Sequence, residues 1–227
     1  MKKILSLAGL LILATAPYAE ELNYNVIGLS AKAEREVPND LMRVQLMVEH
    51  QANKAKDVSQ KVNADMSWAL AQLKSQKGVK YETQQYSTYP VYEKTKIKAW
   101  RASQQLVVES EDFEKLSNLI LDLQAKLQVK NMSFEPTKKT RKKVEDELVS
   151  EALDAYKSRA ALVRKNMQAG AYKIVNMQVN TQGSYSPRYR SQPRMKLMSM
   201  ESKSAPAVEG GSSTLSVNVN GQIQLQQ

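Results

Sequence analysis

The stretch from Tyr86 to Ser110, YSTYPVYEKTKIKAWRASQQLVVES, decides the fold class of this chain. Its second half alternates apolar and polar residues, which is the period of a strand with one buried face. Its first half is rich in tyrosine and threonine, residues that favour strands, and a short basic turn joins the two runs. The stretch therefore predicts two antiparallel strands over residues 78–93 and 97–110, with Trp100 on the apolar face of the second.

Three amphipathic helices are predicted outward from this strand pair. Apolar residues recur every three or four positions within residues 53–76, 111–127 and 144–167. Asn53 and Ser110 are candidate N-caps of the first two helices, and glycines at 78 and 170 follow the ends of the first and third. The third helix is the longest, and we expect it to cover a sheet.

The other strands alternate with these helices. Two strand-like runs within residues 22–51 flank the sequence VPND and predict a hairpin, and further strands are expected over residues 129–135, 172–181 and 215–225. The order ββαββαβαβ-loop-β predicts an α+β fold in which three helices cover one face of a mostly antiparallel sheet. Whether the strands form one lobe or two stays open at this point.

The first 19 residues have the order of a secretory signal. Lys2 and Lys3 precede an apolar run that is too short to span a bilayer, and small residues follow it. We expect cleavage after Ala19, a single mature α+β domain over residues 20–227, with two lobes as an option, and a periplasmic location, with association to the outer membrane as a further option. The chain has no cysteine, so it cannot be a lipoprotein, and we expect no transmembrane segment after the signal is removed.

The composition favours acidic partners. The chain holds 33 Lys and Arg against 23 Asp and Glu, a formal charge of +10, and losing Lys2 and Lys3 with the signal leaves +8. Export makes nucleic acid an unsuitable partner, so we expect instead an anionic component of the envelope, such as lipid or lipopolysaccharide.

The ordered set of motifs resembles the SIMPL-domain family of exported Gram-negative bacterial proteins. The matching elements are VIGLSAKAEREVPNDLMRVQLMVE, QQYSTYPVYE, WRASQQLVVE, DFEKLSNLI, EALDAYKSRA and GGSSTLSVNV. The family includes periplasmic oxidative stress defence proteins and outer-membrane-associated antigens of Brucella. The resemblance implies an α+β exported domain, a tendency to form oligomers and an association with oxidative stress, and it supplies no catalytic residues. One departure is that VIGLSA keeps only Gly28 of the family's V-x-G-x-G pattern.

The chain is poor in residues that catalyse reactions. His50 is the only histidine, so neither a Cys-His pair nor a zinc site of the common His and Cys type can be built. We therefore expect a protein that is not an enzyme and that holds no cofactor.

A long loop is expected at about residues 183–212, where Ser, Pro, Gly and Arg dominate. Met195, Met198 and Met200 lie within it, and soft thioethers bind Cu(I) or form sulfoxide reversibly. This offers an alternative function as a ligand or Cu(I) binder or as an oxidant sink. The simpler interpretation is that the methionines pack the loop onto the body of the protein or onto a neighbouring subunit.

A basic patch precedes the third helix. It consists of five cations within six positions: Lys138, Lys139, Arg141, Lys142 and Lys143. Cations oppose the dipole at a helix start, so we expect the helix to begin near Val144 and the patch to be solvated. Pairs at four-residue spacing, such as Lys142 with Asp146 and Lys143 with Glu147, would relieve part of the repulsion. The alternative is a contact with phosphate or lipid headgroups.

The aromatic residues of the opening stretch are candidates for an interface between subunits. Tyr86, Tyr89, Tyr92 and Trp100 lie on adjacent strands, and Pro90 suits an edge strand or a bulge. Arg188 and Arg190 of the loop are further interface candidates. The leading hypothesis is a homo-oligomeric envelope protein that protects by binding or scaffolding.

Overall fold

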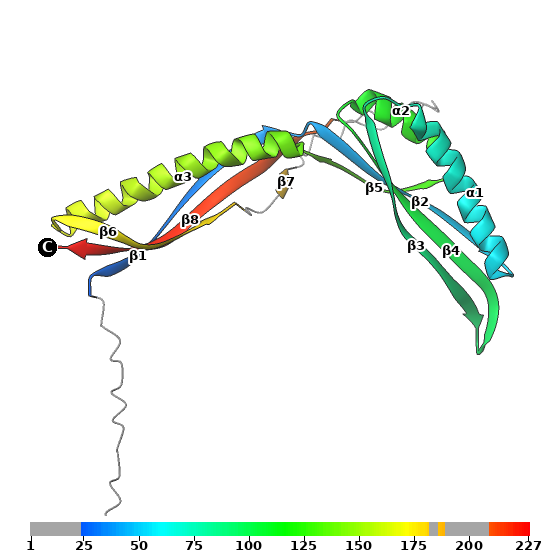
Figure 1. The fold of residues 1–227 in the computed structure, drawn as a ribbon, viewed down its shortest axis with the longest axis horizontal. Coiled ribbons are helices and arrows are strands. Elements are labelled where there is room, and N and C mark those ends of the chain that lie inside the picture. The colour runs from blue at the N-terminus through cyan, green and yellow to red at the C-terminus, as the bar shows by residue number, and fades with distance from the viewer. Residues whose placement is uncertain (1–23, 182–185, 189–208) are drawn as a thin grey trace, which may run out of the picture.

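The computed structural model describes residues 24–181, 186–188 and 209–227. These residues form an arch of two lobes, and the helices follow its outer side (Figure 1). We call them the central lobe and the terminal lobe. The central lobe contains β2 (Leu41–Ala52), α1 (Ala55–Lys74), β3 (Val79–Glu93), β4 (Lys96–Ser110), α2 (Phe113–Leu123) and β5 (Gln128–Glu135). The terminal lobe contains β1 (Val26–Pro38), α3 (Lys138–Asn166), β6 (Ala171–Asn180), β7 (Ser186–Arg188) and β8 (Ser212–Gln226).

The central lobe is a four-stranded antiparallel sheet in the order β3-β4-β2-β5, with α1 and α2 packed on one face. The apolar parity of β2 explains the packing, because Met42, Val44, Leu46 and Val48 are all buried in one core. On α1 the buried residues recur every three or four positions and fill the other side of this core. The apolar face of the strand, with a period of two residues, thus packs against the apolar face of the helix, with a period of 3.6 residues.

The terminal lobe has its own core. Its sheet runs in the order β1-β8-β6, with β7 beside β8, and α3 lies along one face (Figure 1). Val217, Val219 and Ile223 of β8 pack against Leu148, Ala152, Tyr156 and Ala160 of α3, and all are completely buried. The two lobes therefore bury two separate cores.

The expected hairpin between the first two strands is wrong. β1 pairs with β8 over its whole length, from Val26 opposite Gln224 to Pro38 opposite Ser212, whereas β2 lies between β4 and β5 in the other sheet. The physical reason is at Asn39, whose backbone N–H donates to the carbonyl of Gly211 (3.1 Å) and whose side-chain amide donates to that of Gly210 (2.7 Å). These bonds hold the segment between β1 and β2 against the start of β8. The chain therefore continues from the terminal lobe into the central lobe instead of turning back to pair β2 with β1.

The predicted α+β class with antiparallel pairing and three helices is confirmed, and the strands divide between two sheets. The expected caps were wrong: α1 follows Lys54, which makes no side-chain cap, and α2 is capped by Asp112. The helix α3 begins at Lys138, six residues before the expected start, so the basic patch is helical. Within the described ranges, no helix combines the length and the apolar character needed to cross a membrane.

Candidate functional sites at the waist and the sheet edge

Among the described residues, two segments of the chain cross between the lobes, at residues 39–40 and 136–137, and residues 210–211 before β8 are hydrogen-bonded to the first of them. We call this region the waist. Asp40 joins the two crossing segments. Its carboxylate accepts hydrogen bonds from the hydroxyls of Thr140 (2.6 Å) and Thr137 (3.2 Å) and from the backbone N–H of Thr137. Burial acts to raise the pKa of Asp40, but these hydrogen bonds outweigh it, and the pKa is lowered. Asp40, which directly precedes β2, thus already provides a hydrogen-bond acceptor at the N-terminus of α3.

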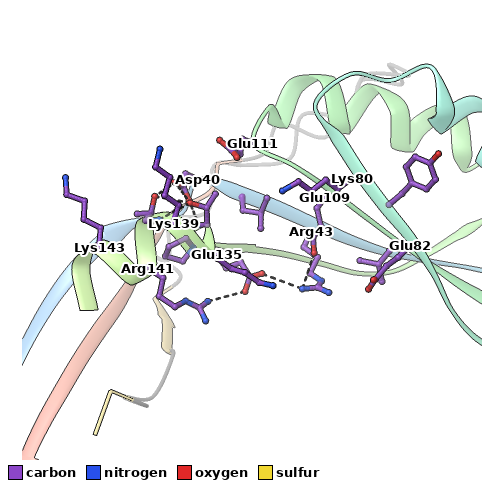
Figure 2. A pocket seen from close by; sticks show the side chains of 17 residues that line it. Asp40, Arg43, Lys80, Glu82, Glu109, Glu111, Glu135, Lys139, Arg141 and Lys143 are labelled. Carbon is purple, nitrogen blue, oxygen red and sulfur yellow. Dashed lines mark hydrogen bonds and ion pairs between the residues drawn. The ribbon is translucent and has the colours of Figure 1, made fainter. Parts of the chain in front are cut away.

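A groove of about 970 Å³ lies beside the waist, between the start of α3 and the ends of β2, β3 and β4. We call it the waist groove. Its charged and hydroxyl-bearing lining comes from both lobes (Figure 2): Asp40, Arg43, Lys80, Tyr81, Glu82, Glu109, Glu111, Glu135, Thr137, Lys138, Lys139, Thr140, Arg141 and Lys143.

The arginines of the groove form an ion-pair chain that links the lobes. Arg141 of α3 lies 3.6 Å from Glu135 at the end of β5, and Glu135 lies 3.7 Å from Arg43 of β2. Arg43 also pairs with Glu109 of β4 at 3.1 Å. Figure 2 shows these groups in a row along one side of the groove. The guanidinium groups are therefore already engaged by protein carboxylates.

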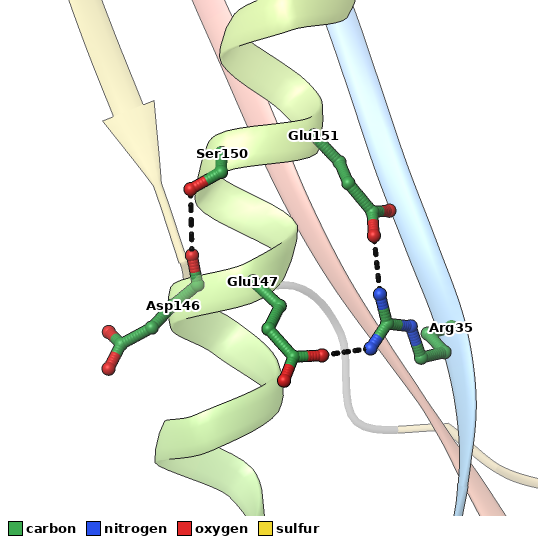
Figure 3. Close-up of polar contacts among 5 residues, drawn as sticks. All are labelled: Arg35, Asp146, Glu147, Ser150 and Glu151. Atoms are coloured by element: carbon green, nitrogen blue, oxygen red, sulfur yellow. Dashed lines mark hydrogen bonds and ion pairs between the residues drawn. The ribbon is translucent and has the colours of Figure 1, made fainter.

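The lysines of the basic patch are not neutralised in the way the sequence predicted. Lys143 does not pair with Glu147, because Glu147 and Glu151 both bind Arg35 of β1 (Figure 3). Among the described residues, no carboxylate lies within ion-pair distance of Lys138, Lys139, Lys142 or Lys143. Since α3 has no acidic residue in its first turn, Lys138 and Lys139 oppose the helix dipole at a cost of about 0.3–1 kcal/mol each.

The second candidate surface is the free edge of the central sheet. β3 is one of the two edge strands of this sheet, β5 being the other, and none of the residues of β3 is buried. Tyr86, Tyr89 and Tyr92 are 45%, 41% and 60% exposed, whereas Trp100 of β4 is partly buried against the core. The structure thus brings the three tyrosines to an open edge and assigns Trp100 mainly to packing.

His50 lies in a structural cluster. Its Nε2 is 2.6 Å from Asp65 of α1, and Asp65 also accepts a hydrogen bond from Lys126 (2.9 Å), whose ammonium lies 5.3 Å from the centre of the Trp68 ring. Burial acts to raise the pKa of Asp65, but the bonds from Lys126 and His50 outweigh it and lower the pKa. The cluster ties the end of β2 to α1 and to the turn that follows α2.

A match to a known protein family covers most of the chain. Residues 27–223 match the family described as SIMPL, a protein of unknown function (DUF541). The chain belongs to the SIMPL family. The match spans both lobes of this SIMPL chain, so the two sheets and the waist are all within the family region. None of the curated proteins compared with the chain matches it significantly.

Some predicted sites of the SIMPL chain lie outside the described residues. They are the signal segment 1–19, the methionines Met195, Met198 and Met200, and Arg190. Arg188 lies in β7, opposite Ser212 of β8, and only its backbone is described. The described part of the chain contains no group of three or more His, Cys, Asp or Glu side chains that could hold a metal ion.

Sequence reasoning found the basic patch and missed the groove. Lys80, Arg43, Glu109 and Glu135 carried no local signal, because each is an ordinary charged residue on the polar side of a strand. The only signal was the electrostatic misfit of five cations at a helix start. The wall that faces the basic patch is formed by strands of the central lobe, so it can be recognised only when the positions of both lobes are known.

Proposed function

We propose that this SIMPL protein is an exported, non-enzymatic envelope protein that self-assembles through the edge strand β3. The observation that carries the proposal is a sheet edge that is only partly protected. From Thr83 to Tyr92 the strand reads TQQYSTYPVY, ten residues without a charge. Natural edges are usually blunted by lysine, by proline or by strong bulges, because an open row of N–H and C=O groups pairs with other strands.

The edge has only partial protection of this kind. Pro90 removes one donor, and irregularities of register interrupt the pairing between Gln84 and Tyr86 and between Val91 and Tyr92. Between these two points Tyr86, Ser87, Thr88 and Tyr89 continue an unbroken ladder with β4. The exposed tyrosine rings at each end of this segment would pack against a partner strand, as aromatic residues do at interfaces.

A second copy of the chain is the proposed occupant, and the test is the mass of the protein with its signal removed. Light scattering after size-exclusion chromatography should give a multiple of the monomer mass for the wild type. Tyr86→Lys with Tyr89→Lys should shift the protein to monomer, since lysine blocks edge pairing. Tyr24→Lys changes another exposed tyrosine outside β3 and serves as the matched control. A wild-type monomer at all concentrations, or a mass unchanged by the edge variant, would contradict the proposal.

The location and the physiological role are part of the same proposal. The order of Lys2, Lys3, the apolar run and small residues supports export to the periplasm. The protective role against oxidative stress rests on the resemblance noted from the sequence motifs. The direct test deletes the gene, challenges cells with peroxide and complements with wild type or with the edge variant. Complementation by wild type alone would link assembly to protection, and full survival of the deletion strain would remove the stress role.

His50 supports the non-enzymatic part of the proposal. Its imidazole is already bound to Asp65, which a lysine also neutralises, and the three groups hold three elements together. A histidine used in this way acts as a structural tie.

A further inference from the structure

We propose that the waist groove binds a phosphate-bearing ligand, with the lysines at the start of α3 on one wall and Lys80 of β3 on the other. The inference concerns a different surface from the β3 edge and does not depend on self-assembly.

The groove gathers cations from elements that are distant in sequence. Lys138, Lys139 and Lys143 come from the first two turns of α3, and Lys80 comes from the second residue of β3. Figure 2 shows Lys80 on β3 extending across the groove toward the start of α3, where Lys139 and Lys143 lie. Asp40 and Glu111 lie near these lysines, and the ion-pair chain from Arg141 to Glu109 lies below them in the view. The arginines of the groove are therefore paired with carboxylates, whereas the lysines are not.

The lysines of the groove carry excess positive charge. Lys80, Lys138, Lys139 and Lys143 have no ion pair with any described residue. Asp40, Glu82 and Glu111 are the lining carboxylates that also have no ion pair, so four cations face three anions, a surplus of one positive charge. A ligand that brings negative charge would relieve this repulsion.

The nature of the cations selects the ligand class. Lysine ammonium groups are flexible point charges that bind phosphate without demanding a planar shape, whereas the arginine forks here are already held by Glu135 and Glu109. Asp40 occupies the helix N-terminus, so backbone amides are not the main donors. We expect recognition by charge, with several phosphate oxygens contacted at once, from either a free polyphosphate or a phosphate-bearing lipid headgroup.

The experiment compares two lysine variants of equal charge. The groove variant is Lys138→Gln, Lys139→Gln and Lys143→Gln. The control variant is Lys56→Gln, Lys61→Gln and Lys74→Gln, three exposed lysines on α1. Binding of inorganic pyrophosphate is measured by calorimetry, and binding to vesicles of phosphatidylcholine with one-fifth phosphatidic acid is measured by sedimentation. Each is repeated at two salt concentrations, because charge recognition weakens as salt rises.

We expect the groove variant to bind at least tenfold more weakly than wild type, the control variant to match wild type, and Lys80→Gln to weaken binding several-fold from the opposite wall. Binding of pyrophosphate alone would identify a free phosphate ligand, and binding of vesicles alone a lipid headgroup. Equal weakening of the groove and control variants would show general charge attraction and overturn the site. The absence of saturable binding of both probes to wild type would also overturn it.

Thermal unfolding separates lost binding from lost folding. Removing cations that oppose the helix dipole should leave the melting temperature of the groove variant equal to or above that of wild type. A lower melting temperature would contradict the electrostatic argument on which the site rests.

Discussion

At the scale of single residues, the terminal lobe depends on one close approach. Tyr156 of α3 is completely buried, and its hydroxyl points at Gly221 of β8. The irregular pairing of β6 between Ile174 and Asn176 brings the carbonyl of Asn176 to the same point. A side chain at position 221 has no room, so this glycine is required for packing.

Gly221→Ala should destabilise the protein by about 1–3 kcal/mol. The added Cβ would lie 2.5 Å from the carbonyl oxygen of Asn176 and 2.8 Å from the hydroxyl oxygen of Tyr156. Urea unfolding followed by circular dichroism measures the loss. Gly28→Ala on β1 is the control, because a Cβ there would have no heavy atom within 4 Å. Similar midpoints for the two variants would show that the terminal lobe accommodates the change.

Asp65 makes stability depend on acid pH. Its pKa is lower in the folded state than its ordinary value, so the unfolded chain takes up the proton first as the pH falls. The contribution of Asp65 is therefore complete above about pH 4, the ordinary value, and disappears as the pH falls through the lower folded-state pKa. Between pH 5 and pH 2, the free energy of unfolding should fall more steeply as the pH is lowered for wild type than for Asp65→Asn. This pH range surrounds the ordinary aspartate pKa of about 3.9. Parallel curves would show that Asp65 makes no such contribution.

At the scale of elements, α3 begins where its own sequence disfavours a helix start. Its first turn holds lysines and no acid, and its local cap is Thr137. The negative charge that this terminus needs is supplied by Asp40, almost a hundred residues earlier in the chain, through bonds to Thr137 and Thr140. The helix therefore starts at Lys138 because of a tertiary contact.

Asp40→Asn should fray the start of α3 and cost about 1–3 kcal/mol, because it removes a charged acceptor of hydrogen bonds. Hydrogen exchange of the amides at residues 138–142 should accelerate, while exchange in α1 stays unchanged. Asp57→Asn, in the first turn of α1, tests the same charge change without the tertiary contact. Unchanged exchange at the start of α3 would contradict the role given to Asp40.

At the scale of the whole molecule, the waist determines how the two lobes are held. Their cores are separate, so the orientation depends on the ties of Asn39 to residues 210 and 211, on Asp40 and on the chain from Arg141 to Arg43. Ser213 adds a hydrogen bond to the side-chain oxygen of Asn39 at 2.6 Å. Hydrogen bonds and ion pairs among the two crossing segments and residues 210–213 favour a single arrangement of the arch.

Gly210→Ala should loosen this arrangement without unfolding either lobe. The added Cβ would lie 2.7 Å from the ring of Phe113 and 2.8 Å from the carbonyl of Asn39, so the link must shift. Small-angle scattering should show a broader distribution of distances than wild type, with little change in circular dichroism. The Gly28→Ala variant again serves as the control. A scattering curve identical to wild type would show that the waist absorbs the methyl group.

The sequence by itself determined the α+β class, the family and the order of elements except β7, because apolar periodicity and turn residues are local signals. β7 (Ser186–Arg188) lies within the loop expected at about residues 183–212, because three residues are too few to show a strand period. It also identified the basic patch through a local electrostatic misfit. Only the tertiary structure decided that β1 and β2 belong to different sheets, since the period-two pattern reports a buried face and not the partner strand. The waist groove likewise needed the structure, because its walls come from residues far apart in the chain that meet only when two separate cores are joined.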